Sequence, residues 1–301
     1  MRNAVLNKIY SWGVSKLATR VLYFTYRKFP PVVKIETTNA CNSSCIMCPH
    51  SIMKRDIGIM DDYLYEKIVK ECANNNVKTL HLHNFGEPLL DKHFADRIAF
   101  AKKLGIPKIK FFTNASLLNC DKAEEIIRSG ADEIKISIDG DSKETYNSIR
   151  VCLNYEIVSK NIINLIDLRK KSGAKKPTVK LNFVVRKDNF HEKSSFKKKW
   201  SRIVDSISFD KEHNWSGKNH FKQENEILHA CLRPWNSFTI LWDGRVALCC
   251  LDYDGETILG DINQQSIKEI WQSDKLRKIR SYHISQDFSC LPLCRSCSKI
   301  R

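Results

Sequence analysis

Short apolar segments alternate with amphipathic segments along the first two thirds of the chain. The apolar segments are rich in β-branched and aromatic residues and are bounded by Gly, Asn or Asp, a pattern that predicts buried strands. These predicted strands lie at residues 32–38, 77–85, 108–114, 133–139, 178–185 and 206–210. The amphipathic segments predict helices at residues 61–75, 91–105, 121–130, 155–173 and 191–203.

Repeated strand–helix units predict a parallel sheet with helices on its outside. Six strands are fewer than the eight of a closed (β/α)8 barrel, so we expect residues 31–211 to form an α/β fold, a partial (β/α)6 TIM-like barrel. The polar segment 212–230 predicts a linker. The last 71 residues, 231–301, then form a separate small module.

The C-terminal module is predicted to contain a β-hairpin and a helix. Residues 238–250 read as two strands that turn at Asp243–Gly244, and residues 266–280 are predicted to form a helix. So small a core is rarely stable without a metal or a disulfide. The cysteines of this module could supply the required cross-link.

Residues 1–30 are aromatic and basic, and we expect a helical extension. Lys8, Lys16, Arg20 and Arg27 interrupt any apolar core that a signal peptide would need. The extension could pack on the main domain or lie on a membrane surface as a peripheral contact. No apolar run approaches the roughly 20 residues of a membrane span, and the absence of export signals together with the free thiols favours a cytoplasmic protein.

The formal net charge of +16 would suit nucleic acid, anionic membrane or phosphorylated substrates. The basic residues form no long tract, and no RNA-binding module is visible beside the two predicted domains. We therefore expect no nucleic-acid partner.

The twelve cysteines are clustered rather than evenly spread, which indicates metal binding more than disulfides. Cys41, Cys45 and Cys48 form a CxxxCxxC motif directly after the first predicted strand. A structural zinc ion needs four ligands, whereas three thiolates on a 4Fe–4S cube leave one iron open. A zinc site that borrows His50 or His83 as its fourth ligand is the alternative.

Four segments, each following a successive strand, resemble the motifs of radical S-adenosylmethionine (SAM) enzymes. They are CNSSCIMC (41–48), NFGEP (84–88), FTNASLL (112–118) and SIDG with YNSIR (137–150). The family's first glycine of the second motif is Phe85 here, but Gly86 and Glu87 are kept. The resemblance spans residues 31–210.

The resemblance implies roles for particular residues. Cys41, Cys45 and Cys48 would ligate a 4Fe–4S cluster whose open iron binds SAM. The remaining implied contacts are with SAM itself. Gly86 and Glu87 would receive its amino group, Ser137 and Arg150 would lie near its carboxylate, and Asn114 would border it. Reduction of SAM would give a 5′-deoxyadenosyl radical that abstracts hydrogen from a substrate carbon.

The C-terminal module resembles the SPASM or twitch modules of radical SAM enzymes, which hold auxiliary 4Fe–4S clusters. We assign one auxiliary cluster to four ligands, Cys231, Cys249, Cys294 and Cys297. Cys250 competes with Cys249, because neighbours in a strand point to opposite faces, and Cys290 is a spare. A zinc ribbon is the alternative.

A fully ligated auxiliary cluster suits an electron acceptor. The layout is similar to the aminocyclitol (2-deoxy-scyllo-inosamine) dehydrogenase type, which implies two-electron oxidation of a hydroxyl-bearing carbon in a small carbohydrate or cyclitol, nucleotide-linked forms included. Peptide or protein maturation is the alternative. Asp252 and Arg186 are candidates for catalytic roles beside the substrate hydroxyl. An electron donor such as flavodoxin or ferredoxin is implied.

Overall fold

The computed structural model describes residues 28–217 and 230–298. Most of the predicted extension at 1–30 and most of the predicted linker at 212–230 therefore lie outside the described residues. The chain divides into two compact units. The barrel unit comprises residues 34–212 and 241–243. The C-terminal unit contains the described residues of 28–33, 213–240 and 244–298.

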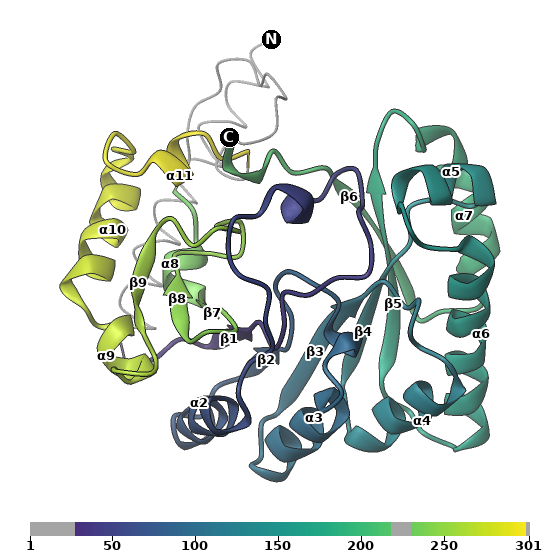
Figure 1. Cartoon of the computed structure of the whole chain (residues 1–301), viewed down its shortest axis with the longest axis horizontal. Coiled ribbons are helices and arrows are strands. Elements are labelled where there is room, and N and C mark those ends of the chain that lie inside the picture. Colours follow the sequence, from purple (N-terminus) through teal and green to yellow (C-terminus); the bar gives the residue numbers. More distant parts are fainter. Residues whose placement is uncertain (1–27, 218–229, 299–301) are drawn as a thin grey trace, which may run out of the picture. The chain divides into compact units, whose positions relative to one another are not determined.

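The barrel unit confirms the predicted alternation of strands and helices (Figure 1). Its strands are β1 (Val32–Ile35), β2 (Thr79–His81), β3 (Lys108–Thr113), β4 (Glu133–Ser137), β5 (Thr178–Val185) and β6 (Ser206–Lys211). They lie side by side in sequence order, and the pairs from β2 to β6 are parallel. Six strands in sequence order, parallel from β2 to β6 and with helices between them, form the expected partial barrel.

Helices cover the outer face of this sheet (Figure 1). The helices of the barrel unit are α2 (Asp62–Asn74), α3 (Phe94–Lys103), α4 (Cys120–Ser129), α5 (Lys143–Ile149), α6 (Tyr155–Lys171) and α7 (Lys193–Trp200). Short 3-10 turns lie at η1 (Pro49–Ile52), η2 (Pro88–Leu90) and η3 (Phe190–Glu192). Phe111 of β3 packs edge-on against Phe94 of α3, and Phe183 of β5 against Phe196 of α7. Alternate strand residues are therefore buried under the helices, and those between them face the inside of the barrel.

The C-terminal unit is built on a small antiparallel sheet. Its elements are η4 (Trp215–Gly217), α8 (Arg233–Asn236), β7 (Ser237–Ile240), β8 (Arg245–Ala247), β9 (Ile258–Asp261), α9 (Ile267–Trp271), α10 (Asp274–Ser285) and α11 (Pro292–Arg295). β7 and β8 pair antiparallel, which confirms the predicted hairpin, and Gly244 in its turn has a φ of +92°. The sequence did not predict β9, which pairs with β8.

The single helix predicted at 266–280 is wrong. Two helices occupy this segment, because the side chain of Ser273 accepts a hydrogen bond from the Leu276 N–H and so begins α10. Ser266 caps α9 in the same way, and Glu269 completes its capping box. Within the described ranges, no helix has the length and apolar character needed to cross a membrane.

Candidate active site and iron–sulfur ligands

The CxxxCxxC loop leaves β1 at the carboxyl edge of the sheet and is held by backbone pairing. The Ser44 N–H donates to the Val151 carbonyl at 3.0 Å, and the Ile46 N–H donates to the Ile149 carbonyl at 3.1 Å. Cys45 and Met47 pack against the buried Ile149. The end of α5 therefore fixes the loop that carries the three thiols.

The thiols share polar neighbours. The Ser43 hydroxyl lies 3.3 Å from the sulfurs of both Cys41 and Cys45. Arg150 Nη1 lies 3.5 Å from the Cys45 sulfur, while its Nε donates to the buried Asp139 at 2.6 Å. Asp139 thus fixes a guanidinium beside the thiols, where a positive charge stabilises thiolates.

The backbone of the NFGEP motif (84–88) contacts the backbone just before Cys41. The Glu87 N–H donates to the Ala40 carbonyl at 2.7 Å. Gly86 has a φ of +83°, and a Cβ there would lie 2.6 Å from the Ala40 oxygen. Only glycine fits both the backbone conformation and the contact. The family motif residue Gly86 therefore sets the position of Cys41 through its neighbour Ala40.

The Glu87 carboxylate joins this loop to the end of β3. It accepts hydrogen bonds from Thr113 Oγ1 and from the Asn114 N–H, both at 2.6 Å, and from the Leu89 N–H at 3.2 Å. Burial raises the pKa of Glu87 to about 7, although these hydrogen bonds act in the opposite direction. A carboxylate has about four acceptor positions, so one is available to a further donor.

Asn114 lies at the same edge as the thiols. Its Nδ2 donates to Asn42 Oδ1 in the cysteine loop at 2.9 Å, and its Oδ1 accepts from the Ser116 N–H at 2.9 Å. Ser137 ends β4, in register with Asn182 of β5. The barrel unit therefore gathers the residues predicted from the four motifs at the carboxyl ends of successive strands.

The three thiols suit a cluster better than a single ion. Among the described residues, no three His, Cys, Asp or Glu side chains converge closely enough to hold one metal ion. In a cube each thiolate binds its own iron, so such convergence is not required. Burial raises the pKa of Cys41, and that of Cys48 to about 12, so cluster binding must displace protons. His50 Nε2 is hydrogen-bonded to the Asn39 carbonyl at 2.7 Å, and His83 packs on Phe112.

Two buried carboxylates at this edge were not predicted. Glu36 forms a paired contact with Arg55 at 2.8 and 3.0 Å and accepts from Asn84 Nδ2 at 3.1 Å. Asp139, which holds Arg150, also accepts the Val184 N–H at 2.6 Å. Glu36 directly follows an apolar strand, and Asp139 lies inside the SIDG motif. These two positions in the sequence could have indicated that the carboxylates belong to the site.

Asp252 and Arg186, the two residues predicted to act on the substrate, both form hydrogen bonds or ion pairs within the protein. Both Asp252 oxygens accept backbone N–H groups, from Glu256 at 2.8 Å and from Thr257 at 2.9 Å, which closes the loop after β8. Arg186 pairs with Glu212 and with Asp188. Burial raises the pKa of Glu212, which follows β6 and which the sequence did not single out. The catalytic roles of Asp252 and Arg186 stay predictions.

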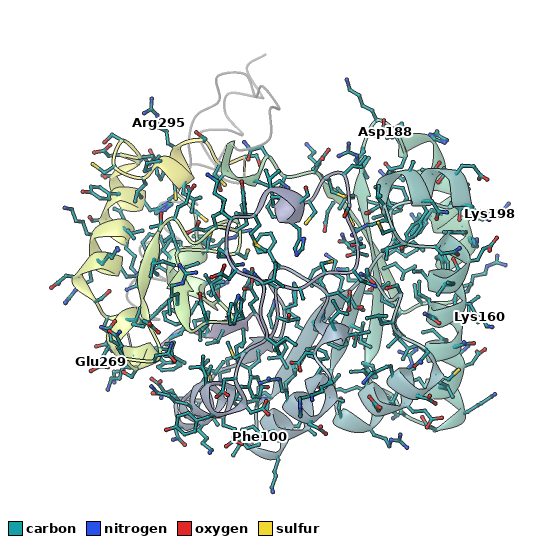
Figure 2. The ribbon with its side chains drawn as sticks, in the orientation of Figure 1. Phe100, Lys160, Asp188, Lys198, Glu269 and Arg295 are labelled. Atoms are coloured by element: carbon teal, nitrogen blue, oxygen red, sulfur yellow. The ribbon has the colours of Figure 1, made fainter. Side chains whose placement is uncertain are left out.

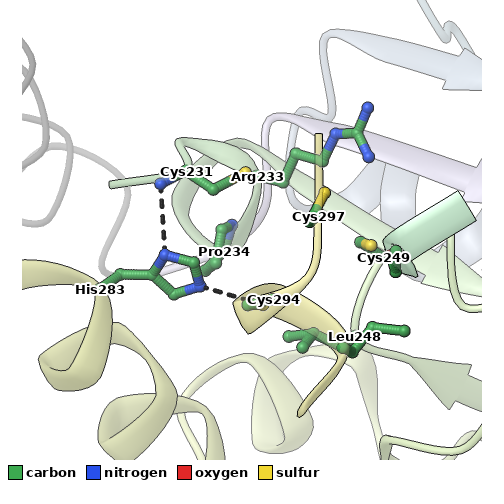
Figure 3. A pocket seen from close by; sticks show the side chains of 10 residues that line it. Cys231, Arg233, Pro234, Leu248, Cys249, His283, Cys294 and Cys297 are labelled. Atoms are coloured by element: carbon green, nitrogen blue, oxygen red, sulfur yellow. Dashed lines mark hydrogen bonds between the residues drawn. The ribbon is translucent and has the colours of Figure 1, made fainter. Parts of the chain in front are cut away.

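The C-terminal unit contains a pocket lined by four cysteine side chains, Cys231, Cys249, Cys294 and Cys297 (Figure 3). Cys250 and Cys290 are not among its lining residues. Arg233 also lines the pocket, and its guanidinium interacts with the thiol of Cys249. Residues from α8, the end of β8, α10 and the C-terminal turn thus meet around one small space.

His283 of α10 contacts two of these cysteines (Figure 3). Its Nδ1 accepts the Cys231 N–H at 3.2 Å, and its Nε2 lies 3.5 Å from the Cys294 sulfur. Burial lowers the pKa of His283 to about 4, so the ring is neutral near pH 7. Because Nδ1 accepts, Nε2 carries the proton and donates toward Cys294.

A match to the radical SAM superfamily covers residues 35–197, more than half of the chain. The protein belongs to the radical SAM superfamily. Residues 231–298 match the SPASM iron–sulfur cluster-binding domain. The protein therefore uses SAM with a 4Fe–4S cluster, and its C-terminal region holds auxiliary iron–sulfur rather than zinc.

Relatives with assigned activities differ in substrate. The SAM-dependent 2-deoxy-scyllo-inosamine dehydrogenase of Niallia circulans is 22% identical over 273 residues, which cover 89% of this chain and 93% of that protein. A probable GTP 3′,8-cyclase of Saccharolobus solfataricus is 29% identical over 167 residues, 54% of this chain and 51% of that protein. The similarity to the probable GTP 3′,8-cyclase thus covers only about half of each protein.

Solved structures with the same fold include BtrN in complex with AdoMet and 2-DOIA, with a TM-score of 0.63 and 18% identity, covering 90% of this chain and 94% of BtrN. Streptococcus suis SuiB bound to the precursor peptide SuiA has a TM-score of 0.69 and 15% identity, covering 91% and 70% of the two chains. At these identities the likeness shows the radical SAM partial-barrel fold.

A glycine exchange tests the close approach at Gly86. We expect Gly86→Ala to lower iron incorporation and SAM binding severely, because the new Cβ would meet backbone atoms of Asn39 and Ala40. Gly105→Ala is the matched control, since Gly105 has the same φ of +83° but no atom within 4 Å of an added Cβ. The control isolates the cost of the left-handed backbone, about 1 kcal/mol. Equal iron and SAM binding in both variants would contradict this interpretation.

Proposed function

We propose that this radical SAM enzyme oxidises a hydroxyl-bearing carbon of a small carbohydrate or cyclitol to a carbonyl. The observation that carries the proposal is the pocket of the C-terminal unit with its four cysteines, since four protein ligands leave no iron open for substrate. Such a cluster suits electron transfer. The whole-length likeness to a cyclitol dehydrogenase supports the same reaction.

The ligand assignments are part of the proposal. Cys41, Cys45 and Cys48 hold the cluster that binds SAM, while Cys231, Cys249, Cys294 and Cys297 hold one auxiliary cluster. Cys249 is preferred to Cys250 because only Cys249 lines the pocket.

The residues at the barrel edge position SAM. The free acceptor position of Glu87 and the backbone of Gly86 receive its ammonium group. Arg150, fixed by Asp139, lies with Ser137 on the side of its carboxylate, and Asn114 borders it.

The reaction balances if one electron enters and one leaves. When bound, the cluster and SAM supply a 5′-deoxyadenosyl radical, which takes one hydrogen atom from the substrate carbon. The substrate then loses its hydroxyl proton and one electron to become a carbonyl. An external reductant such as flavodoxin or ferredoxin supplies the first electron, and the auxiliary site accepts the second.

The proposal is tested with the anaerobically reconstituted, reduced enzyme and candidate cyclitols or sugars carrying deuterium at one carbinol carbon. We expect deuterium in 5′-deoxyadenosine and an equal amount of carbonyl product. The double variant Cys294→Ala/Cys297→Ala should still cleave SAM but form no carbonyl, because its electron acceptor is lost. Turnover only with peptides, or carbonyl formation by the double variant, would contradict the proposal and favour peptide maturation.

The contact of His283 with Cys294 predicts a change in reduction potential. Hydrogen bonds to cluster sulfurs stabilise the reduced, more negative state. We therefore expect His283→Leu to shift the auxiliary cluster to a lower potential, measured by a redox titration followed by electron paramagnetic resonance. His283→Gln, which keeps a donor, should restore part of the shift. An unchanged potential at full iron content would refute the role of this hydrogen bond.

A further inference from the structure

The inner face of the barrel sheet is rich in lysine. Ile109 and Phe111 of β3 are buried toward the helices, so Lys108 and Lys110 face the other side. The same alternation applies along β1, β4 and β5. It gives one set of side chains, which we call the lysine face: Lys34, Lys108, Lys110, Lys135 and Lys180. All five are only partly buried, so solvent and solutes can reach them.

Strand register places these lysines next to one another. Lys135 of β4 is paired with Lys180 of β5, and Lys110 of β3 is paired with Glu133, two residues before Lys135. Like charges on directly paired strand residues are destabilising. Such an arrangement persists where function requires it.

The carboxylates on this face do not balance the lysines. Glu133 pairs with Lys108 at 2.7 Å, and Asp210 of β6 pairs with Lys135 at 3.0 Å. Lys34, Lys110 and Lys180 form no ion pair with a carboxylate of the described residues. The charge of Glu133 also acts on Lys110 and Lys180, but one carboxylate cannot neutralise this many lysines, so a net positive charge remains for a ligand.

His83 lies among these lysines. Its ring centroid is 4.3 Å from that of Phe112, and its Nδ1 is buried without a hydrogen-bond partner in the described part of the chain. Burial, followed by the charges of Lys34, Lys110 and Lys135, lowers the pKa of His83 well below its usual value. In the tautomer with its proton on Nδ1, a neutral imidazole can donate this unused hydrogen bond to an oxygen atom of a ligand.

The lysine face lies directly below the SAM-binding edge. Lys135 precedes Ser137 by two residues on β4, a Cα separation of about 7 Å at the rise of a strand. Phe112 precedes Asn114 by the same number of residues. One ligand could therefore place a ring near the strand ends and a charged group at the lysines.

We propose that the substrate carries a phosphoryl group, as a phosphate monoester or a diphosphate, which binds to Lys110, Lys180 and their neighbours Lys34 and Lys135 on the inner face of the barrel. The inference rests on the proposed function for the reacting end of the substrate. Lysine binds phosphate as a point charge, and the excess of lysines over carboxylates on this face can neutralise the roughly two negative charges of a phosphate monoester or of a diphosphate diester. Sugar phosphates and nucleotide-linked sugars share this chemistry.

The test is calorimetric binding to the full-length, reconstituted protein with SAM. The probes are glucose 1-phosphate, UDP-glucose and neutral myo-inositol. We expect binding of at least one phosphorylated probe, weakened by salt, and a dissociation constant at least about tenfold higher in Lys110→Gln/Lys180→Gln. The double variant Lys197→Gln/Lys198→Gln is the matched control, because both lysines of α7 are exposed and the change in charge is the same. Figure 2 labels Lys198. The dissociation constant of this control should be unchanged.

Tighter binding of UDP-glucose would identify a nucleotide-linked substrate, and tighter binding of glucose 1-phosphate a monoester. Equal binding to all three proteins, no binding of either phosphorylated probe, or equally tight binding of myo-inositol would overturn the inference. The calorimetric dissociation constant does not depend on whether the enzyme turns the probe over. Binding of a phosphorylated probe here would support the phosphoryl site whether or not that probe is oxidised, so failure of this inference and failure of the proposed oxidation can be distinguished.

Discussion

Replacing Cys41, Cys45 and Cys48 together with alanine is expected to lower the iron content from about eight to about four per chain and to abolish SAM cleavage. The three thiols lie on one loop that is held by the backbone at Ile149 and Val151. Loss of all three would remove every protein ligand that we propose for the SAM-binding cluster. The C-terminal pocket has its own four cysteines and should retain its iron.

The control for this variant is Cys120→Ala/Cys152→Ala, which removes two exposed thiols outside both cysteine clusters. Iron and sulfide are counted after anaerobic reconstitution. A starting content of about four irons that falls to none would contradict an auxiliary 4Fe–4S cluster in the C-terminal unit. The proposed dehydrogenase would then lose its electron acceptor, and a redox-neutral reaction or peptide modification would fit better.

The barrel was predictable because its strands and helices carry strong local signals. Residues 178–185 form β5 as predicted, and helix α4 begins after its capping residue Asn119 and ends at Gly130. Packing on the helices and parallel pairing then leave little freedom in how successive βα units are arranged. The break between α9 and α10 was missed although the sequence carries two signals for it. The apolar face changes between Trp271 and Leu276, and Ser273 caps the new helix.

The part of the site that sequence motifs define was predictable. The spacing of Cys41, Cys45 and Cys48 and the order of the four segments are local properties of the sequence. The contacts of Asp139 with Arg150 and of His283 with Cys294 depend on tertiary packing. No spacing of residues in the sequence predicts them. The lysine face is an intermediate case, since each strand shows its own lysines, but only the register of β4 and β5 brings Lys135 beside Lys180.

Glu87→Gln is expected to weaken SAM binding by roughly 10- to 100-fold, the effect of losing one or more hydrogen bonds to a charged group. The change preserves the shape of the side chain but removes the negative charge that receives the SAM ammonium group. It also turns a donor toward the Asn114 N–H or the Thr113 hydroxyl, both of which now donate to Glu87 at 2.6 Å. SAM cleavage should fall with SAM binding.

Glu192→Gln is the matched control for this variant. Glu192 is also a buried carboxylate of the barrel unit, and it accepts hydrogen bonds from the Asp141 N–H and the Thr145 hydroxyl, away from the thiols. Both variants should lose stability, but only Glu87→Gln should lose SAM affinity at full iron content. Unchanged SAM affinity in Glu87→Gln would show that Glu87 serves only to join the Gly86 loop to β3. The SAM ammonium group would then be bound by backbone carbonyls alone.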